Sequence, residues 1–215
     1  MRCDKNMMRL YAVTDRAWTG RQSLYEQVEA ALKNGVTCVQ LREKNLDDAA
    51  FLAEARQLAA LCRGYGVPFI VNDNVDIAIQ CGADGVHVGQ GDMAASAVRR
   101  RVGDRMIVGV SAHTVKEALE AVRNGADYLG AGAVFSTSTK TDVDVMSFET
   151  LSDICRAVDI PVVAIGGISK HNILQLSGSG VAGVAVVSAI FGAEDPGAAA
   201  AELLRLSEEM AVGHE

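Results

Sequence analysis

The segment 68–92, PFIVNDNVDIAIQCGADGVHVGQGD, contains the pattern that decides the fold. Its first part, PFIVND at 68–73, is an apolar run with β-branched residues, and GVHVG at 85–89 is a second such run. Between them, 75–81 has the apolar spacing of a short helix, and Gly82 follows as a residue that often ends helices. A strand, a helix and a second strand in this order predict a βαβ unit with parallel strands.

The same alternation extends from this unit toward both ends of the chain. Further strands are expected at 10–15, 38–43, 106–111, 128–134, 161–166 and 183–188. Further helices are expected at 23–34, 47–65, 93–101, 114–124, 147–158, 169–177 and 196–211. Eight β/α units without a visible linker favour an α/β fold, a (β/α)8 TIM barrel formed by a single domain over 1–215. An open doubly wound sheet is the alternative, but it more often has about five to seven strands.

Composition narrows the class of protein. The 215 residues are 49% hydrophobic and 22% charged, as in ordinary globular proteins. A formal net charge of -7 disfavours general attraction to nucleic acid or to an anionic membrane, so any bound anion requires a local basic cluster. The five cysteines form no metal-ligand pattern and are expected to be reduced thiols. With no apolar run of signal-peptide length, the chain is expected to be cytoplasmic, and a homo-oligomer is allowed.

Polar residues gather where the predicted strands end, which in a TIM barrel is the active-site face. Gln40, Arg42 and Lys44 follow one another at the strand period of two, so they are expected to face one space. The remaining strand-end and loop candidates are Asn72, Asp73, Gln90, Asp92, Ser111, Thr137, Thr139 and Lys140. The last three lie in 135–146, FSTSTKTDVDVM, a loop whose length is typical of lids or binding segments.

The charges in this set fit a diphosphate and a metal ion. Arg42 supplies a bidentate fork, and Lys44 and Lys140 supply point charges for phosphate oxygens. Asp73 and Asp92 follow neighbouring strands and are expected to share a Mg2+ ion, which favours one or two carboxylates together with substrate phosphate. A purely structural network of ion pairs is the alternative interpretation of these charges.

A second anion site is expected on the other side of the ring. Gly166-Gly167-Ile168 follows the seventh strand and Val187-Ser188-Ala189 follows the eighth. Loops at these places commonly bind phosphate through backbone N–H groups, although a Gly-Gly pair alone can be a tight turn. Two anion sites predict an enzyme with two phosphorylated small-molecule substrates.

Seven motifs follow one another along the chain. They are AVTD at 12–15, VQLREK at 39–44, VNDNVDIAIQCGADGVHVGQGD at 71–92, GVSAH at 109–113, GADYLGAGAVFSTSTK at 125–140, PVVAIGGI at 161–168 and GVAVVSAI at 183–190. In this order they resemble the motifs of the thiamine phosphate synthase family, over about 10–195. The resemblance implies a magnesium-dependent transferase. It would couple 4-amino-5-hydroxymethyl-2-methylpyrimidine diphosphate with a thiazole phosphate, with or without a carboxylate, and release pyrophosphate.

The resemblance also implies a role for each candidate. Arg42, Lys44, Asn72 and Lys140 would hold the diphosphate, Asp73 and Asp92 the Mg2+ ion, and Gln40 and Ser111 the aminopyrimidine. Thr137, Thr139, Gly167, Val187 and Ser188 would meet the thiazole phosphate or the reacting centre. The residues expected to act in catalysis are Arg42, Lys44, Ser111 and Lys140.

Two other functions remain as alternatives. A thiazole tautomerase of the same family would need the thiazole phosphate site but not the diphosphate and magnesium residues, which this chain retains. A non-catalytic sensor of phosphorylated ligands would be expected to have lost some of them. Ala133 and Ser136 stand where the family often has proline. His87 and His113 are candidates for polar roles, but a hydrogen-bonded structural role is favoured for each.

Overall fold

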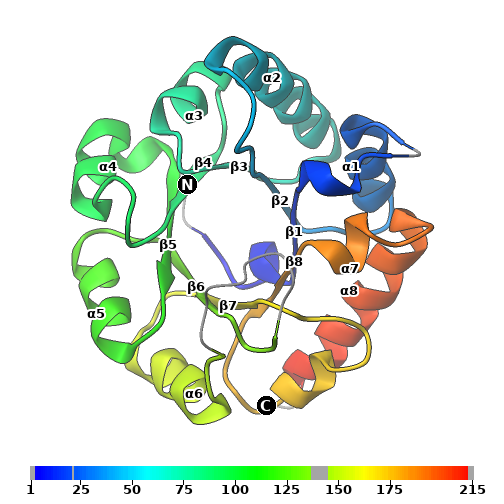
Figure 1. The fold of residues 1–215 in the computed structure, drawn as a ribbon. Coiled ribbons are helices and arrows are strands. Elements are labelled where there is room, and N and C mark those ends of the chain that lie inside the picture. The colour runs from blue at the N-terminus through cyan, green and yellow to red at the C-terminus, as the bar shows by residue number, and fades with distance from the viewer. Residues whose placement is uncertain (1–2, 21, 137–144, 213–215) are drawn as a thin grey trace.

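Eight parallel strands close into a barrel in chain order, and helices surround them as a ring (Figure 1). A computed structural model describes residues 3–20, 22–136 and 145–212 of the chain. The strands are β1 (Leu10–Val13), β2 (Cys38–Leu41), β3 (Phe69–Asn72), β4 (Gly85–Val88), β5 (Ile107–Ala112), β6 (Tyr128–Gly132), β7 (Val162–Ile165) and β8 (Gly183–Val186). Pairing of Leu10 in β1 with Val184 in β8 completes the ring, so the predicted barrel is confirmed and the open sheet is excluded.

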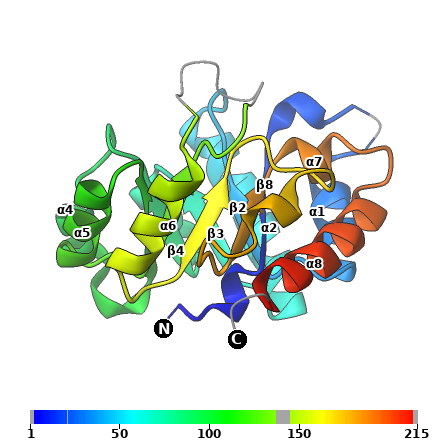
Figure 2. The same ribbon diagram turned by 90° about the horizontal axis from the view of Figure 1, so that it is seen from below.

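The helices lie outside the strands and cover them, as the side view in Figure 2 shows. They are α1 (Leu24–Lys33), α2 (Asp48–Tyr65), α3 (Val75–Cys81), α4 (Ala95–Val102), α5 (Val115–Arg123), α6 (Phe148–Ala157), α7 (Ser188–Phe191) and α8 (Pro196–Val212). Short 3-10 helices lie at Asn6–Met8, Arg16–Trp18, Gly103–Arg105 and Ile173–Leu176. No helix in the described ranges is both long enough and apolar enough to span a membrane.

Local capping explains where many helices begin and end. Ser23 and Glu26 form a reciprocal capping box at the start of α1, and the Asn74 side chain accepts from the Ile77 N–H at the start of α3. Gly82 ends α3 in the left-handed conformation, with φ 69°, as its sequence position indicated. These contacts are local, which is why the helix limits could be predicted closely.

The helix expected at 169–177 is wrong in extent and type. Only Ile173–Leu176 is helical, and it is a 3-10 helix. Asn172 turns its side chain back to accept from the Ser169 N–H, and Gly178, with φ 86°, changes the chain direction soon after. The chain is thus bent on both sides of this segment. A single 3-10 turn is enough to bury its two apolar residues, Ile173 and Leu176.

The barrel has two separate apolar layers. Between strands and helices lies a large cluster of aliphatic side chains, whereas the barrel interior holds a smaller cluster that includes Met8, Tyr11, Ile107 and Tyr128. Tyr11 from β1 and Tyr128 from β6 pack edge to face with ring centroids 5.9 Å apart. These side chains fill the interior at this level, and a pocket that Tyr11 helps to line opens at the carboxyl ends of the strands.

Gly109 on β5 makes room for Tyr128, which predicts a large effect of a single methyl group. A Cβ at Gly109 would overlap the Tyr128 ring and hydroxyl, and Tyr128 has no exposed surface. We expect Gly109→Ala to lower the free energy of unfolding by about 1–3 kcal/mol in urea denaturation, because overpacking forces side chains from their positions. Gly64→Ala is the control: α2 has open space there, so alanine should raise stability by up to about 1 kcal/mol. An unchanged midpoint for Gly109→Ala would contradict this account of the interior.

Candidate active site at the mouth of the barrel

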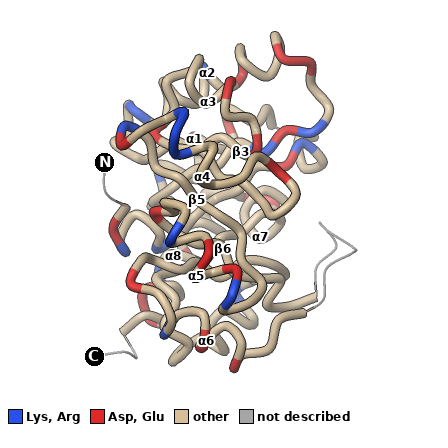
Figure 3. The backbone as a smooth tube through the Cα atoms, turned by 90° about the vertical axis from the view of Figure 1, so that its left-hand side faces the viewer, with Lys and Arg blue, Asp and Glu red and all other residues tan. Residues whose placement is uncertain are grey.

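A pocket opens at the carboxyl ends of the strands and takes lining residues from all eight of them. The lining is Tyr11, Val13, Gln40, Arg42, Asn72, His87, Ser111, His113, Gly130, Gly132, Ala133, Val163, Ile165, Gly166, Gly167, Ile168, Ala185, Val186, Val187 and Ser188. The side of β1–β5 supplies the polar side chains, and the side of β6–β8 supplies aliphatic side chains and exposed backbone. Outside the pocket, on the side of the molecule seen in Figure 3, Lys and Arg residues are interspersed with Asp and Glu residues.

The candidates from the sequence divide into three groups. Those that line the pocket are Gln40, Arg42, Asn72, Ser111, Gly167, Val187 and Ser188. Those outside the lining are Lys44, Asp73, Gln90 and Asp92, of which Gln90 donates to the carbonyl of the lining residue Ser111. Thr137, Thr139 and Lys140 lie outside the residues that the structure describes.

The expected alignment of Gln40, Arg42 and Lys44 is only partly correct. Gln40 is buried and donates from Nε2 to the Tyr11 hydroxyl at 2.8 Å, and both Gln40 and Arg42 line the pocket. Lys44 does not line it; its Nζ lies 2.6 Å from Asp73 Oδ2. Strand β2 ends at Leu41, before the expected limit at 43, so the period of two no longer governs Lys44.

Asp73 and Asp92 come from neighbouring strand ends but are held in different ways. Asp73 has φ 62°, and among the described residues it is the only one besides glycines with a positive φ. Its N–H donates to the His87 carbonyl, while Oδ2 of Asp92 accepts from the Gly89 N–H at 2.7 Å. Strained backbone of this kind is concentrated at functional sites.

The described residues contain no group of three or more His, Cys, Asp or Glu side chains that could hold a metal by themselves. Asp73 and Asp92, which follow the neighbouring strands β3 and β4, nevertheless supply the hard oxygen donors that Mg2+ uses when substrate phosphate and water complete its coordination. The pair therefore fits a magnesium ion that arrives with a phosphorylated substrate, and not one enclosed by protein ligands alone.

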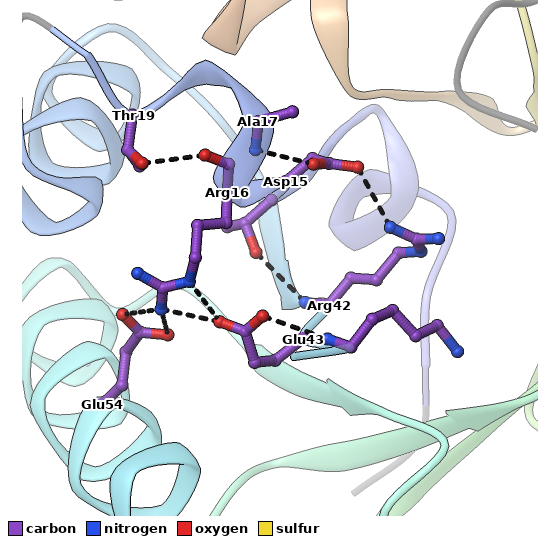
Figure 4. A network of polar contacts seen from close by, with 9 residues as sticks. Asp15, Arg16, Ala17, Thr19, Arg42, Glu43 and Glu54 are labelled. Carbon is purple, nitrogen blue, oxygen red and sulfur yellow. Dashed lines mark hydrogen bonds and ion pairs between the residues drawn. The ribbon is translucent and has the colours of Figure 1, made fainter. Parts of the chain in front are cut away.

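Asp15 and Arg16, which follow β1, hold the end of β2 in place (Figure 4). Arg42, which lines the pocket, has its guanidinium 3.0 Å from Asp15 Oδ2. Arg16 contacts Glu43 Oε2 at 2.6 Å and Glu54 Oε1, on α2, at 2.8 Å. Glu43 is thus held by Arg16 outside the lining, whereas its neighbour Arg42 is held by Asp15 within it.

Glu43 and Glu54 both contact Arg16 and are both partly buried, yet their pKa values shift in opposite directions. Burial alone would raise the pKa of Glu43, but hydrogen bonds from Arg16 and from the Lys44 N–H outweigh it and the pKa is lowered. At Glu54, burial is the larger effect and raises the pKa, with Arg16 opposing it. Arg16 thus keeps Glu43 ionised below the pocket wall.

Three residues that were not among the proposed site residues join the pocket floor into one polar chain. Tyr11 and Tyr128 hydroxyls lie 2.8 Å apart, Tyr128 lies 2.9 Å from His87 Nδ1, and His87 Nε2 lies 3.0 Å from Ser111 Oγ. His87, for which the sequence favoured a hydrogen-bonded structural role, makes these hydrogen bonds and also lines the pocket, as does His113. The only sequence signal was a polar side chain in the middle of an apolar strand.

The loops after β7 and β8 form the opposite side of the pocket. Gly167 has φ 64°, and a Cβ there would overlap the carbonyl oxygens of Phe135 and Ser136. Asn172 Nδ2 donates to the Gly167 carbonyl at 2.9 Å and fixes the turn. Glycine at 167 is therefore required by the approach of the loop after β6, a packing reason that the sequence did not indicate.

Comparisons with known proteins agree on one family. The model of the family described as "Thiamine monophosphate synthase" matches residues 10–190. The thiamine-phosphate synthase of Ruminiclostridium cellulolyticum is 49% identical over 92% of this chain and 94% of its own length. That of Chloroflexus aurantiacus is 47% identical over 92% of each chain. The structure of a thiamine phosphate pyrophosphorylase from Pyrococcus furiosus superposes with a TM-score of 0.88 and 41% identity, covering 96% of this chain and 98% of that one.

The Arg16 contacts predict a pH-dependent loss of stability when the guanidinium is removed. The Glu43 side chain is 3% exposed, so Arg16→Met should lower the free energy of unfolding by about 1–3 kcal/mol at pH 7. The Glu43 pKa is below its ordinary 4.5 in the folded protein, so this stabilisation is complete above that pH and is lost as the pH falls further. The deficit should therefore shrink toward pH 4 in urea titrations. Arg205→Met is the control, because Arg205 pairs with Glu209 at the surface and should change stability by less than about 0.5 kcal/mol. An equal deficit at both pH values would contradict the assignment.

Proposed function

The chain belongs to the thiamine monophosphate synthase family and is a transferase that forms thiamine phosphate; we propose that the pocket at the barrel mouth carries the reaction. The substrates would be 4-amino-5-hydroxymethyl-2-methylpyrimidine diphosphate and a thiazole phosphate, and pyrophosphate would leave. The observation that carries this assignment is the division of the pocket into a polar, charged side at β2–β5 and an apolar, backbone-lined side at β7–β8.

The charged side fits the diphosphate. Arg42 and Asn72 both line the pocket, and Lys44 pairs with Asp73, the residue after Asn72. A planar fork and an ammonium group provide strong, charge-assisted contacts to phosphate oxygens. Lys140, outside the described residues, is kept as a further cation for this substrate. Asp15 fixes the Arg42 guanidinium before substrate arrives, which lowers the cost of ordering it on binding.

Asp73 and Asp92 would hold the magnesium ion. When bound, Mg2+ would neutralise charge that develops on the pyrophosphate as it leaves. Lys44 pairs with Asp73 at 2.6 Å and would exchange that carboxylate for a phosphate oxygen when both substrate and metal are present. After such an exchange Asp73 would face the metal ion and Lys44 the phosphate, so each charged group would keep a partner of opposite charge.

The polar floor fits the pyrimidine and the opposite side fits the thiazole phosphate. Gln40 and Ser111 present amide and hydroxyl groups from β2 and β5, which suit a ring with an amino group. Gly167, Val187 and Ser188 expose backbone on the far side, where no charged side chain lines the pocket within the described ranges. Thr137 and Thr139, also proposed for this substrate, lie outside the described residues.

The reaction needs positioning and charge stabilisation more than a base. The C–O bond to the diphosphate breaks and pyrophosphate keeps the electron pair, leaving a cation that the aminopyrimidine ring stabilises. The thiazole nitrogen then donates its lone pair to the methylene carbon and forms the C–N bond, with no proton to remove. Val163, Ile165 and Ala185 line the apolar side and would limit the access of water that could capture the cation. Ser111 would hold the pyrimidine in line for this capture.

A cytoplasmic location is kept as part of the proposal. Each of the five cysteines is a free thiol, and burial raises the pKa of Cys3, Cys62 and Cys155 to about 12. These thiols are therefore protonated and unreactive at neutral pH. Assembly into homo-oligomers is also part of the proposal, and the molecular mass in solution would test it.

The decisive experiment measures pyrophosphate released from the pyrimidine diphosphate in four mixtures, with and without the thiazole phosphate and with and without Mg2+. We expect stoichiometric pyrophosphate and thiamine phosphate only when both are present, and loss of turnover in excess chelator. Isomerisation of a thiazole without pyrophosphate release would identify a tautomerase instead. Binding of both phosphates without any product would identify a sensor.

Asp73→Asn separates the metal function from the fold. Asparagine tolerates the positive φ of this position, so the variant should fold. We expect turnover with saturating Mg2+ to fall by roughly 10-fold or more, on the scale of one lost metal contact, while thiazole phosphate affinity changes only a few-fold. Asp76→Asn is the matched control, because Asp76 on α3 is 62% exposed and pairs with Arg101 outside the pocket. Loss of binding of both substrates in Asp73→Asn would indicate one shared phosphate pocket.

A further inference from the structure

Five polar side chains from five strands form a continuous hydrogen-bonded chain across the pocket floor. It runs from Gln40 on β2 through Tyr11 on β1 and Tyr128 on β6 to His87 on β4 and Ser111 on β5. Every link is between 2.8 and 3.0 Å. Its two ends, Gln40 and Ser111, both line the pocket, whereas Tyr128 in the middle has no exposed surface.

One order of the protons gives every link of this chain a nitrogen or oxygen acceptor. Gln40 Nε2 donates to the Tyr11 oxygen, so the Tyr11 proton goes to the Tyr128 oxygen. The Tyr128 proton then goes to His87 Nδ1, which must accept it. A neutral imidazole that accepts at Nδ1 carries its proton on Nε2 and donates it to Ser111 Oγ. The Ser111 proton is left to point into the pocket.

The opposite order is disfavoured by burial. It would place two donors, Gln40 and Tyr128, on the Tyr11 oxygen and leave the Tyr11 proton to the Cys38 sulfur, which is a weak acceptor. Tyr11 is 1% exposed, so exchanging an oxygen acceptor for sulfur there would cost part of the desolvation penalty of the hydroxyl. Burial also raises the pKa of both tyrosines well above the ordinary value, so neither can relieve the conflict by ionising.

We propose that Tyr11, Tyr128 and His87 are positioning residues that fix this proton order, so that the pocket presents the Gln40 carbonyl oxygen as an acceptor and the Ser111 hydroxyl as a donor. An acceptor suits an exocyclic amino group and a donor suits an unprotonated ring nitrogen. The inference rests on the proposed function for the identity of the substrate, and deepens it by naming what selects the amino form of the pyrimidine.

The order predicts discrimination against the corresponding pyrimidinone. That ring has a carbonyl in place of the amino group and a protonated ring nitrogen, which reverses both hydrogen bonds. Accepting it would require every proton in the chain to shift and the Gln40 amide to turn. A site built in this way rejects the wrong donor and acceptor pattern because buried polar groups would be left unpaired.

The first test is spectroscopic and needs no substrate. In protein labelled with 15N-histidine, the His87 signals are identified by their absence in His87→Asn. We expect Nδ1 to have the shift of an unprotonated nitrogen and Nε2 that of a protonated one at neutral pH. A proton on Nδ1, or on both nitrogens, would overturn the proposal. The measurement on the unaltered chain decides the order even if a floor variant does not fold.

The second test compares turnover of the aminopyrimidine diphosphate and its pyrimidinone analogue with thiazole phosphate and Mg2+. Tyr11→Phe removes the hydroxyl that accepts from Gln40 at 2.8 Å and donates to Tyr128, so the ratio of the two kcat/KM values should fall by roughly 10-fold or more, together with a mixed His87 tautomer signal. Tyr25→Phe is the control, because Tyr25 on α1 is exposed, and it should leave both unchanged. An unchanged ratio in Tyr11→Phe would overturn the proposal. Absence of turnover with every substrate in the unaltered chain would instead refute the proposed function.

Discussion

The interior of the closed barrel is the constraint on which the rest of the structure depends. Eight parallel strands leave space for few side chains, and Tyr11 and Tyr128 occupy it edge to face with their hydroxyls hydrogen-bonded. Gly109 gives the second ring its room. These rings fix the depth at which packing ends and the pocket begins. They also place two hydroxyl groups under the substrate, so the same pair that fills the core supplies the centre of the polar floor.

Interactions between strand ends are the second level of organisation. Arg16 after β1 binds Glu43 after β2, and Asp15 binds Arg42. Glu43 points away from the pocket while Arg42 lines it, so one ion pair sets the direction of the next side chain. The long, flexible Arg42 side chain is thereby ordered by its ion pair with Asp15. The conformational entropy of the Arg42 side chain is therefore lost when the protein folds and not when the substrate binds.

The two sides of the pocket would bind phosphate through different interactions. At β2–β4, phosphate would meet side-chain charges and a carboxylate pair, whose strength depends on pH and salt. At β7–β8, backbone and aliphatic groups line the wall, and Gly167 has its positive φ because the loop after β6 approaches closely. The first side can respond to charge that appears during the reaction, whereas the second holds a group whose charge does not change. This division suits a leaving group on one side and an intact phosphate on the other.

The sequence by itself determined the alternation of eight strands with helices, the helix caps and the strand-end residues that line the pocket, since these depend on local periodicity and on short motifs. It did not predict the 3-10 helix at Ile173–Leu176, the pairing of Lys44 with Asp73 or the role of Arg16. Nor did it link Tyr11 to Tyr128, which are 117 positions apart. Those features were decided only by the tertiary structure, because closure of the barrel sets the distances between side chains on separate strands and no local pattern encodes them.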